Sequence, residues 1–213
     1  MAPDGTWRLI RHLGSLPTRH WGFSIYRTTY TPLSQQRFPD LIKTINSYMK
    51  RSILKEHGFN PALLTEPRRA TYEMLCDCYR PTILDNTQLF NNISLPSVRS
   101  HFEAWSEQQH VFNPALPSQL HACLVIDDEM VNALADARPW VEGVADDAVD
   151  RKFNRLGWWV KVVEAWPDLE ETLDGTMRVL IFELWRLWTA IHDPVPPIAH
   201  LERHWDCGGL YLG

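Results

Sequence analysis

The stretch QLHACLVID, from Gln119 to Asp127, constrains the fold most, because it is a nearly continuous apolar run with the length of a β-strand. A strand that is buried on both faces has such a run, whereas a half-exposed strand alternates apolar and polar residues. The sequence therefore predicts a central strand here. Three acids end the run, Asp127, Asp128 and Glu129. Acids are favoured where a helix begins, so this cluster is predicted to open a helix, with a catalytic role as the alternative.

A second strand is predicted in the stretch HWGFSIYRTTYTP, from His20 to Pro32. Its period of two places Trp21, Phe23 and Ile25 on one face, with Arg27 next in the same row. A guanidinium at the end of such an apolar row needs a partner.

Apolar spacing and turn residues predict the other elements. These are a helix that Ser34 caps and that ends near Gly58, a strand from Thr71 to Tyr79, a short helix from Ser94 to Gln109 with an Arg99–Glu103 ion pair, a strand from Leu156 to Trp166, and a long helix from Leu173 to Ile191. Together they predict one α+β domain over residues 1–213. We expect a mixed sheet of about four strands with helices mainly on one face, as in ferredoxin-like domains.

Composition fits an ordinary globular protein of 213 residues, with 45% hydrophobic and 22% charged residues. No apolar run is long enough to span a membrane, and the first residues lack the apolar segment of a secretory signal, so a cytoplasmic protein is expected. Four cysteines suggest reduced thiols rather than a disulfide scaffold. Ten tryptophans indicate either a thick aromatic core or an aromatic-lined pocket.

Charge is uneven along the chain. Residues 1–105 carry 13 basic and 8 acidic side chains, for a net charge of +5, and residues 106–213 carry a net charge of −10. Basic residues that converge on one face could bind phosphates, although a solvated surface with uneven charge explains the same numbers.

Known catalytic motifs are absent from the sequence. It has no Walker pattern, no G-x-G-x-x-G and no G-x-S-x-G, which disfavours nucleotide hydrolysis, dinucleotide binding and a serine-hydrolase site. We expect no cofactor and no metal. The spacing of His200, His204 and Cys207 leaves a three-ligand zinc site open as an alternative.

Glu183 is the most interesting carboxylate, because it interrupts the apolar C-terminal helix close to Trp185 and Trp188. Burial among these rings would raise its pKa and suit it to carry a proton. The alternative is an acid at the edge of the helix that pairs with Arg186.

The stretches WGFSIYRTTYTP, LPSVRSHFEAW and GWWVKVV carry a family resemblance that spans most of the chain from Trp21 to Trp188. The chain resembles a large family of filamentous-fungal proteins of about this size. The nearest functional association is with fungal arginine-containing cyclodipeptide synthases, which are small tRNA-dependent enzymes of specialised metabolism. No catalytic motif of that group matches this chain residue by residue, so no residue role is carried over.

The resemblance implies a transferase with charged tRNA as a partner and an aminoacyl or other small substrate, without membrane attachment. Such an enzyme must hold a tRNA acceptor arm, recognise an arginyl side chain and move a proton as an amine attacks an ester. The candidate catalytic residues are Glu183, Arg27 and Tyr26. The candidate substrate-binding residues are Asp85, Asp127, Trp105, Trp158 and Trp188.

Two alternatives for Arg27 stay open. At the end of a strand it could meet a phosphate or carboxylate of a ligand, or it could cap the sheet by pairing with Asp85 or Asp127. Two other functions also stay open. These are a non-catalytic binding protein with an aromatic groove, and a tailoring cyclase that acts on a small metabolite.

Overall fold

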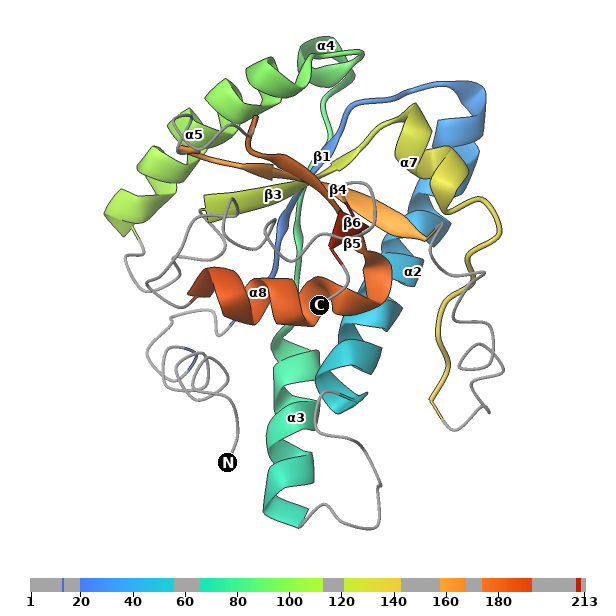
Figure 1. Ribbon diagram of the computed structural model, residues 1–213, viewed down its shortest axis with the longest axis vertical. Coiled ribbons are helices and arrows are strands. Elements are labelled where there is room, and N and C mark those ends of the chain that lie inside the picture. The colour runs from blue at the N-terminus through green and yellow to red at the C-terminus, as the bar shows by residue number, and fades with distance from the viewer. Residues whose placement is uncertain are drawn as a thin grey trace.

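A mixed β-sheet forms the middle layer of the molecule (Figure 1). This computed structural model describes residues 13, 20–55, 66–112, 121–142, 158–167, 174–192 and 210–211. In spatial order the strands are β2 (Thr82–Leu84), β1 (Ser24–Arg27), β3 (Ala122–Ile126), β4 (Trp159–Glu164), β5 (Thr176–Leu180) and the two-residue β6 (Leu210–Tyr211). Strand β1 runs parallel to both β2 and β3, whereas β3, β4 and β5 are antiparallel in succession and β6 is parallel to β5.

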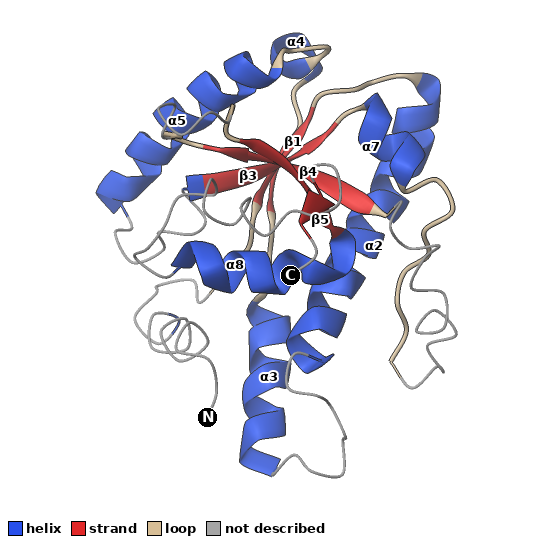
Figure 2. Ribbon diagram, in the orientation of Figure 1, coloured by secondary structure: helices blue, strands red, loops and turns tan. Residues whose placement is uncertain are grey.

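Helices cover both faces of this sheet (Figure 2). They are α2 (Pro32–Lys55), α3 (Glu66–Cys78), α4 (Thr87–Phe90), α5 (Leu95–Phe112), α7 (Asp128–Ala133), the 3₁₀ helix η3 (Ile181–Glu183) and α8 (Leu184–His192). The larger core cluster joins α2, α3, α7 and α8 to one face of the sheet. The smaller cluster joins α4 and α5 to the other face.

Strand β3 explains how one apolar run serves both cores. Leu124 and Ile126 belong to the larger cluster, whereas Cys123 and Val125 belong to the smaller one. Every residue of β3 is buried, which confirms the predicted central strand. Trp21, Phe23 and Ile25 share the larger core as the period of two predicts, although the regular strand begins only at Ser24.

The α+β class is confirmed, but the sheet has more strands than the four expected. Five strands have three or more residues, and β6 adds a short sixth. The helices favour one face, yet α5 covers much of the other (Figure 1). The ferredoxin-like arrangement is wrong, because its β-α-β-β-α-β order differs from the two successive crossovers that join β1, β2 and β3 here.

The predicted strand from Thr71 to Tyr79 is wrong, since these residues lie in α3 and in the bridge that follows it. Tyr72, Leu75 and Tyr79 are buried at helical spacing, while Met74 is exposed. Short apolar segments with polar residues between them fit both the period of a helix and the period of a strand. Contacts between α3 and α2 favour the helix.

The predicted long helix from Leu173 to Ile191 is also wrong in its first half. Its residues from Thr176 to Leu180 form β5, and a turn of 3₁₀ helix then leads into α8. Met177 and Val179 face the larger core, while Arg178 between them is exposed. These residues therefore alternate as in a strand, although the apolar residues of the whole segment also recur at helical spacing. Pairing with β4 decides between the two.

Two local predictions also change. Helix α2 begins at Pro32, and the Thr31 hydroxyl accepts a hydrogen bond from the Ser34 N–H, so Thr31 occupies the capping position that we assigned to Ser34. Arg99 donates to the carbonyls of Glu164 and Asp174, which ties α5 to the ends of β4 and β5 in place of the expected pair with Glu103.

Candidate functional site

The three parallel strands create a topological switch point at their carboxyl ends. The connection from β1 to β2 passes through α2 and α3 on one face of the sheet, whereas the connection from β2 to β3 passes through α5 on the opposite face. Because β2 and β3 flank β1, the two connections leave the sheet in opposite directions. In open α/β sheets, ligands bind outside the carboxyl ends of the strands at such a point.

Arg27, the last residue of β1, lies at this point and is buried, with 8% of its surface exposed. Its guanidinium donates to the Thr29 carbonyl at 3.1 Å, to the Asp85 carboxylate at 3.2 Å and to the Ser34 hydroxyl at 3.5 Å. The rings of Tyr30 and Phe38 lie 4.6 Å and 4.4 Å from its central carbon. Arg27 therefore joins the end of β1, the residue after β2 and the first turn of α2.

The loop after β1 contacts the loop after β3 across the switch point. The backbone N–H and the hydroxyl of Thr28 both donate to the Ile126 carbonyl. The hydroxyls of Thr29 and Thr31 donate to the same oxygen of Asp128, at 2.5 Å and 3.4 Å. Two carboxylates that are exposed to solvent therefore lie at this point. Asp128 accepts a hydrogen bond from Thr29, and Asp85 accepts one from Arg27.

We call the group of Arg27, Thr29, Tyr30, Asp85 and Asp128 the carboxyl-edge cluster. Within it, the Tyr30 hydroxyl donates to the Arg27 carbonyl at 3.2 Å. Burial and the adjacent Asp85 carboxylate raise the pKa of Tyr30 to about 12, so the phenol is protonated at neutral pH. The cluster therefore presents carboxylate acceptors to the solvent side, because the hydroxyls of Thr29 and Tyr30 already donate within it.

A chain of ion pairs continues from the cluster along the edge of the sheet. One Asp127 oxygen caps α7 by accepting the Met130 N–H at 2.9 Å, and the other pairs with Lys161 of β4. Lys161 also pairs with Glu129, which in turn pairs with Arg178 of β5. The hydrogen bond from Lys161 is the largest cause that lowers the pKa of Glu129. Burial alone would lower the pKa of Lys161, but hydrogen bonds to Asp127 and Glu129 raise it.

Tyr26 and Trp105, two of the candidate residues, lie on the opposite face of the sheet in the smaller core cluster. The Tyr26 hydroxyl is 2.8 Å from Nδ1 of His101, and its ring packs edge-on against Phe90 and Phe102. Burial raises the pKa of Tyr26. The ring of Trp105 stacks on Phe102. The structure therefore separates both residues from Arg27 by the thickness of the sheet.

The remaining candidates are dispersed. Glu183 lies in η3, where its carboxylate, with 15% of its side chain exposed, is 3.4 Å from Arg186. Trp188 is 1% exposed and packs against Trp21 and Phe23 in the larger core. Trp158 packs edge-on against Tyr48 and donates its indole N–H to Asp136. Of the eight candidate residues, the structure brings together Arg27, Asp85 and Asp127 at the carboxyl edge.

Sequence reasoning missed Thr29, Thr31 and Lys161, and it favoured a helix start over a catalytic role for Asp128. A usable signal was present for the threonines, because TTYT directly follows the first strand and DDE directly follows the central strand. Lys161 had no local signal, since it reaches Asp127 only through the pairing of β4 with β3.

The part of the chain that the structure describes contains no group of three or more His, Cys, Asp or Glu side chains placed to hold a metal ion. His200, His204 and Cys207 lie outside the described residues. Among the described helices, none combines the length and the apolar character that crossing a membrane requires. Comparison with known protein families, curated proteins and solved structures gave no match.

Proposed function

We propose that this protein is a small transferase of specialised metabolism that binds an arginyl substrate at the carboxyl-edge cluster and forms an arginine-containing cyclodipeptide from charged tRNA. The observation that carries the proposal is the position of two exposed carboxylates, Asp85 and Asp128, on either side of the polar loop at the switch point. A planar guanidinium is well matched to such carboxylates, since each of its N–H groups can donate to a carboxylate oxygen.

The two exposed acids of the cluster, Asp85 and Asp128, have acceptor positions left for a ligand. Arg27 is buried and forms three hydrogen bonds, so it neutralises part of the Asp85 charge without occupying all of the acceptor positions of that carboxylate. Asp128 accepts hydrogen bonds from the hydroxyls of Thr29 and Thr31, both at Oδ1. The proposed arginyl group lies between these acids, next to Tyr30.

Support for charged tRNA comes from the family resemblance and from the net charge of +5 in residues 1–105. The reaction forms two amide bonds, breaks two ester bonds to tRNA and releases the ring. Three of the described tryptophans do not favour the aromatic-groove alternative, because Trp21, Trp185 and Trp188 are core residues, whereas Trp166 is exposed.

The test is a product assay with purified protein. The mixture contains arginyl-tRNA, a second charged tRNA and the protein, and mass spectrometry measures diketopiperazines. We expect an arginine-containing diketopiperazine that disappears when ribonuclease is added first. Asp128→Asn should lower its yield about tenfold or more, the effect of losing roughly 1.4 kcal/mol of charge-assisted hydrogen bonding.

The matched control is Asp40→Asn, which changes an exposed acid on α2 whose carboxylate pairs with Lys43. This variant should keep the wild-type yield. A folded wild-type protein that gives no such product would contradict the synthase proposal. A product that forms with Asp128→Asn at the wild-type yield would place the arginyl site elsewhere, and a product that survives ribonuclease would favour a metabolite cyclase.

A further inference from the structure

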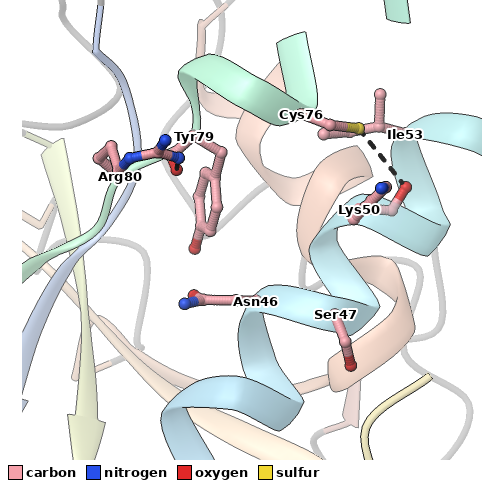
Figure 3. Close-up of a pocket in the computed structure, with 7 residues that line it drawn as sticks. All are labelled: Asn46, Ser47, Lys50, Ile53, Cys76, Tyr79 and Arg80. Atoms are coloured by element: carbon pink, nitrogen blue, oxygen red, sulfur yellow. Dashed lines mark hydrogen bonds between the residues drawn. The ribbon is translucent and has the colours of Figure 1, made fainter. Parts of the chain in front are cut away.

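A second polar feature lies at the opposite edge of the parallel strands, in a pocket of about 270 Å³ between α2 and α3 (Figure 3). It is lined by Asn46, Ser47, Lys50 and Ile53 of α2, by Cys76 of α3, and by Tyr79 and Arg80, which follow α3. Tyr79 bridges to Trp21, which precedes β1, so the pocket lies near the amino ends of β1 and β2. The carboxyl-edge cluster is at the other ends of these strands.

Two buried polar atoms in this pocket have no hydrogen-bond partner among the described residues. They are the Tyr79 hydroxyl oxygen and Oδ1 of Asn46. Tyr79 is 6% exposed, and Figure 3 shows its hydroxyl and the Asn46 side chain pointing toward the same space from opposite sides. A buried polar group without a partner costs roughly 1–3 kcal/mol, so a group that supplies both partners would bind favourably here.

The other polar groups of the pocket do not supply these partners. The Ser47 hydroxyl already donates to the Thr44 carbonyl and accepts the Trp140 N–H, each at 2.8 Å. The Cys76 thiol lies 4.0 Å from the Lys50 carbonyl, and burial raises the pKa of this thiol to about 12. Cys76 therefore lines the pocket as a neutral thiol rather than as a nucleophile.

Two cations at the pocket determine the charge of a ligand. Lys50 pairs with Glu142 at 3.7 Å, but both side chains are about half exposed, so this pair is weak and can be exchanged. Arg80 donates one N–H to the Tyr79 carbonyl at 2.7 Å, and a guanidinium has five N–H groups. Both residues can therefore bind a carboxylate at the mouth of the pocket.

We propose that the pocket between α2 and α3 binds a small carboxylic acid that also carries a hydroxyl or amide group. The hydroxyl or amide accepts from the Tyr79 hydroxyl and donates to Asn46, while the carboxylate meets one of the two cations, Lys50 or Arg80, which lie on either side of Tyr79 (Figure 3). The volume is slightly smaller than that of most ligand sites, which fits a metabolite of a few carbons. This site is distinct from the proposed arginyl site and does not depend on the proposed function.

The test uses three probes that differ in one group each. Lactate has both the hydroxyl and the carboxylate, propionate lacks the hydroxyl, and lactamide lacks the carboxylate. Calorimetry and thermal unfolding should show that lactate binds at millimolar concentration and that the other two bind at least about fivefold more weakly. Crystals soaked in lactate should show it between Tyr79 and Asn46.

Tyr79→Phe removes only the unpartnered hydroxyl. It should leave the unfolding temperature of the free protein unchanged or higher, and it should weaken lactate about fivefold or more while leaving propionate unaffected. Tyr72→Phe, on α3 but outside the pocket lining, should bind lactate as the wild type does. The proposal is overturned if lactate fails to bind, if only water occupies the pocket, if Tyr79→Phe binds lactate normally, or if Tyr79→Phe destabilises the free protein strongly.

Discussion

At the scale of single residues, Arg27 shows how a charge can end an apolar row. The row of Trp21, Phe23 and Ile25 is buried in the larger core, and the next position of the same row reaches the edge of the sheet. There the guanidinium donates hydrogen bonds to Asp85, to a carbonyl and to a hydroxyl, and it packs against two aromatic rings. A flat, delocalised cation satisfies all of these at once, which the point charge of lysine does not.

Arg27→Lys should therefore lower the free energy of unfolding by about 2 kcal/mol, because lysine loses the fork of hydrogen bonds and the stacking on Tyr30 and Phe38. Urea unfolding monitored by circular dichroism measures the change. The matched control is Arg186→Lys, since Arg186 is half exposed and pairs with Glu183. That control should stay within about 0.5 kcal/mol of the wild type. Equal effects of the two substitutions would contradict a special role for the Arg27 guanidinium.

At the scale of elements, β5 depends on the turn that starts it. Gly175 precedes the strand with a φ of +63°, a conformation that residues with a Cβ rarely adopt. A Cβ at this position would lie 2.6 Å from Cβ of Pro167, too close for the turn to persist unchanged. The left-handed residue and the close approach to the end of β4 together direct the chain into a strand.

Gly175→Ala should destabilise the protein by about 2 kcal/mol or more, because both backbone strain and a steric clash are added. Thermal unfolding is the measurement. Asn92→Ala is the comparison, since Asn92 has a φ of 56° and already carries a side chain, so this substitution adds only the conformational cost of about 1 kcal/mol. If Gly175→Ala costs no more than Asn92→Ala, the contact with Pro167 does not constrain the turn.

At the scale of the whole molecule, several weak acids are buried in their neutral forms. Burial raises the pKa of Cys76 to about 12 and also raises the pKa values of Cys123, Tyr26 and Tyr79. Each group keeps its proton in the folded protein at a pH at which the unfolded chain releases it. Stability is therefore full below the ordinary pKa values and is lost as pH rises above them.

The free energy of unfolding should fall with increasing slope above pH 9.0, the ordinary pKa of a thiol, by about 1.4 kcal/mol per pH unit for each group that ionises only on unfolding. Urea unfolding at a series of pH values measures this slope. Cys76→Ala should reduce the slope between pH 9.0 and about 12 by the share of one group. Ser100→Ala, which removes a hydroxyl that does not titrate, should not change it. A slope that Cys76→Ala leaves unaltered would show that this thiol ionises equally easily in both states.

The sequence by itself determined the class of the fold and the strands whose patterns are unambiguous. The apolar run before Asp127 is a central strand, because helices cover both faces of β3. The strand that begins at Ser24 ends at Arg27, where a polar loop follows it. Helices α2 and α5 were also predicted, since each keeps one apolar stripe over many turns.

Only the tertiary structure decided the rest. Residues from Thr71 to Tyr79 and from Thr176 to Leu180 carry spacings that suit both a helix and a strand, and contacts with α2 and pairing with β4 chose between them. The same holds for the candidate site. Asp85, Asp128 and Thr29 are far apart in the chain, and they meet because three parallel strands end at one edge, a consequence of strand order that no local pattern encodes.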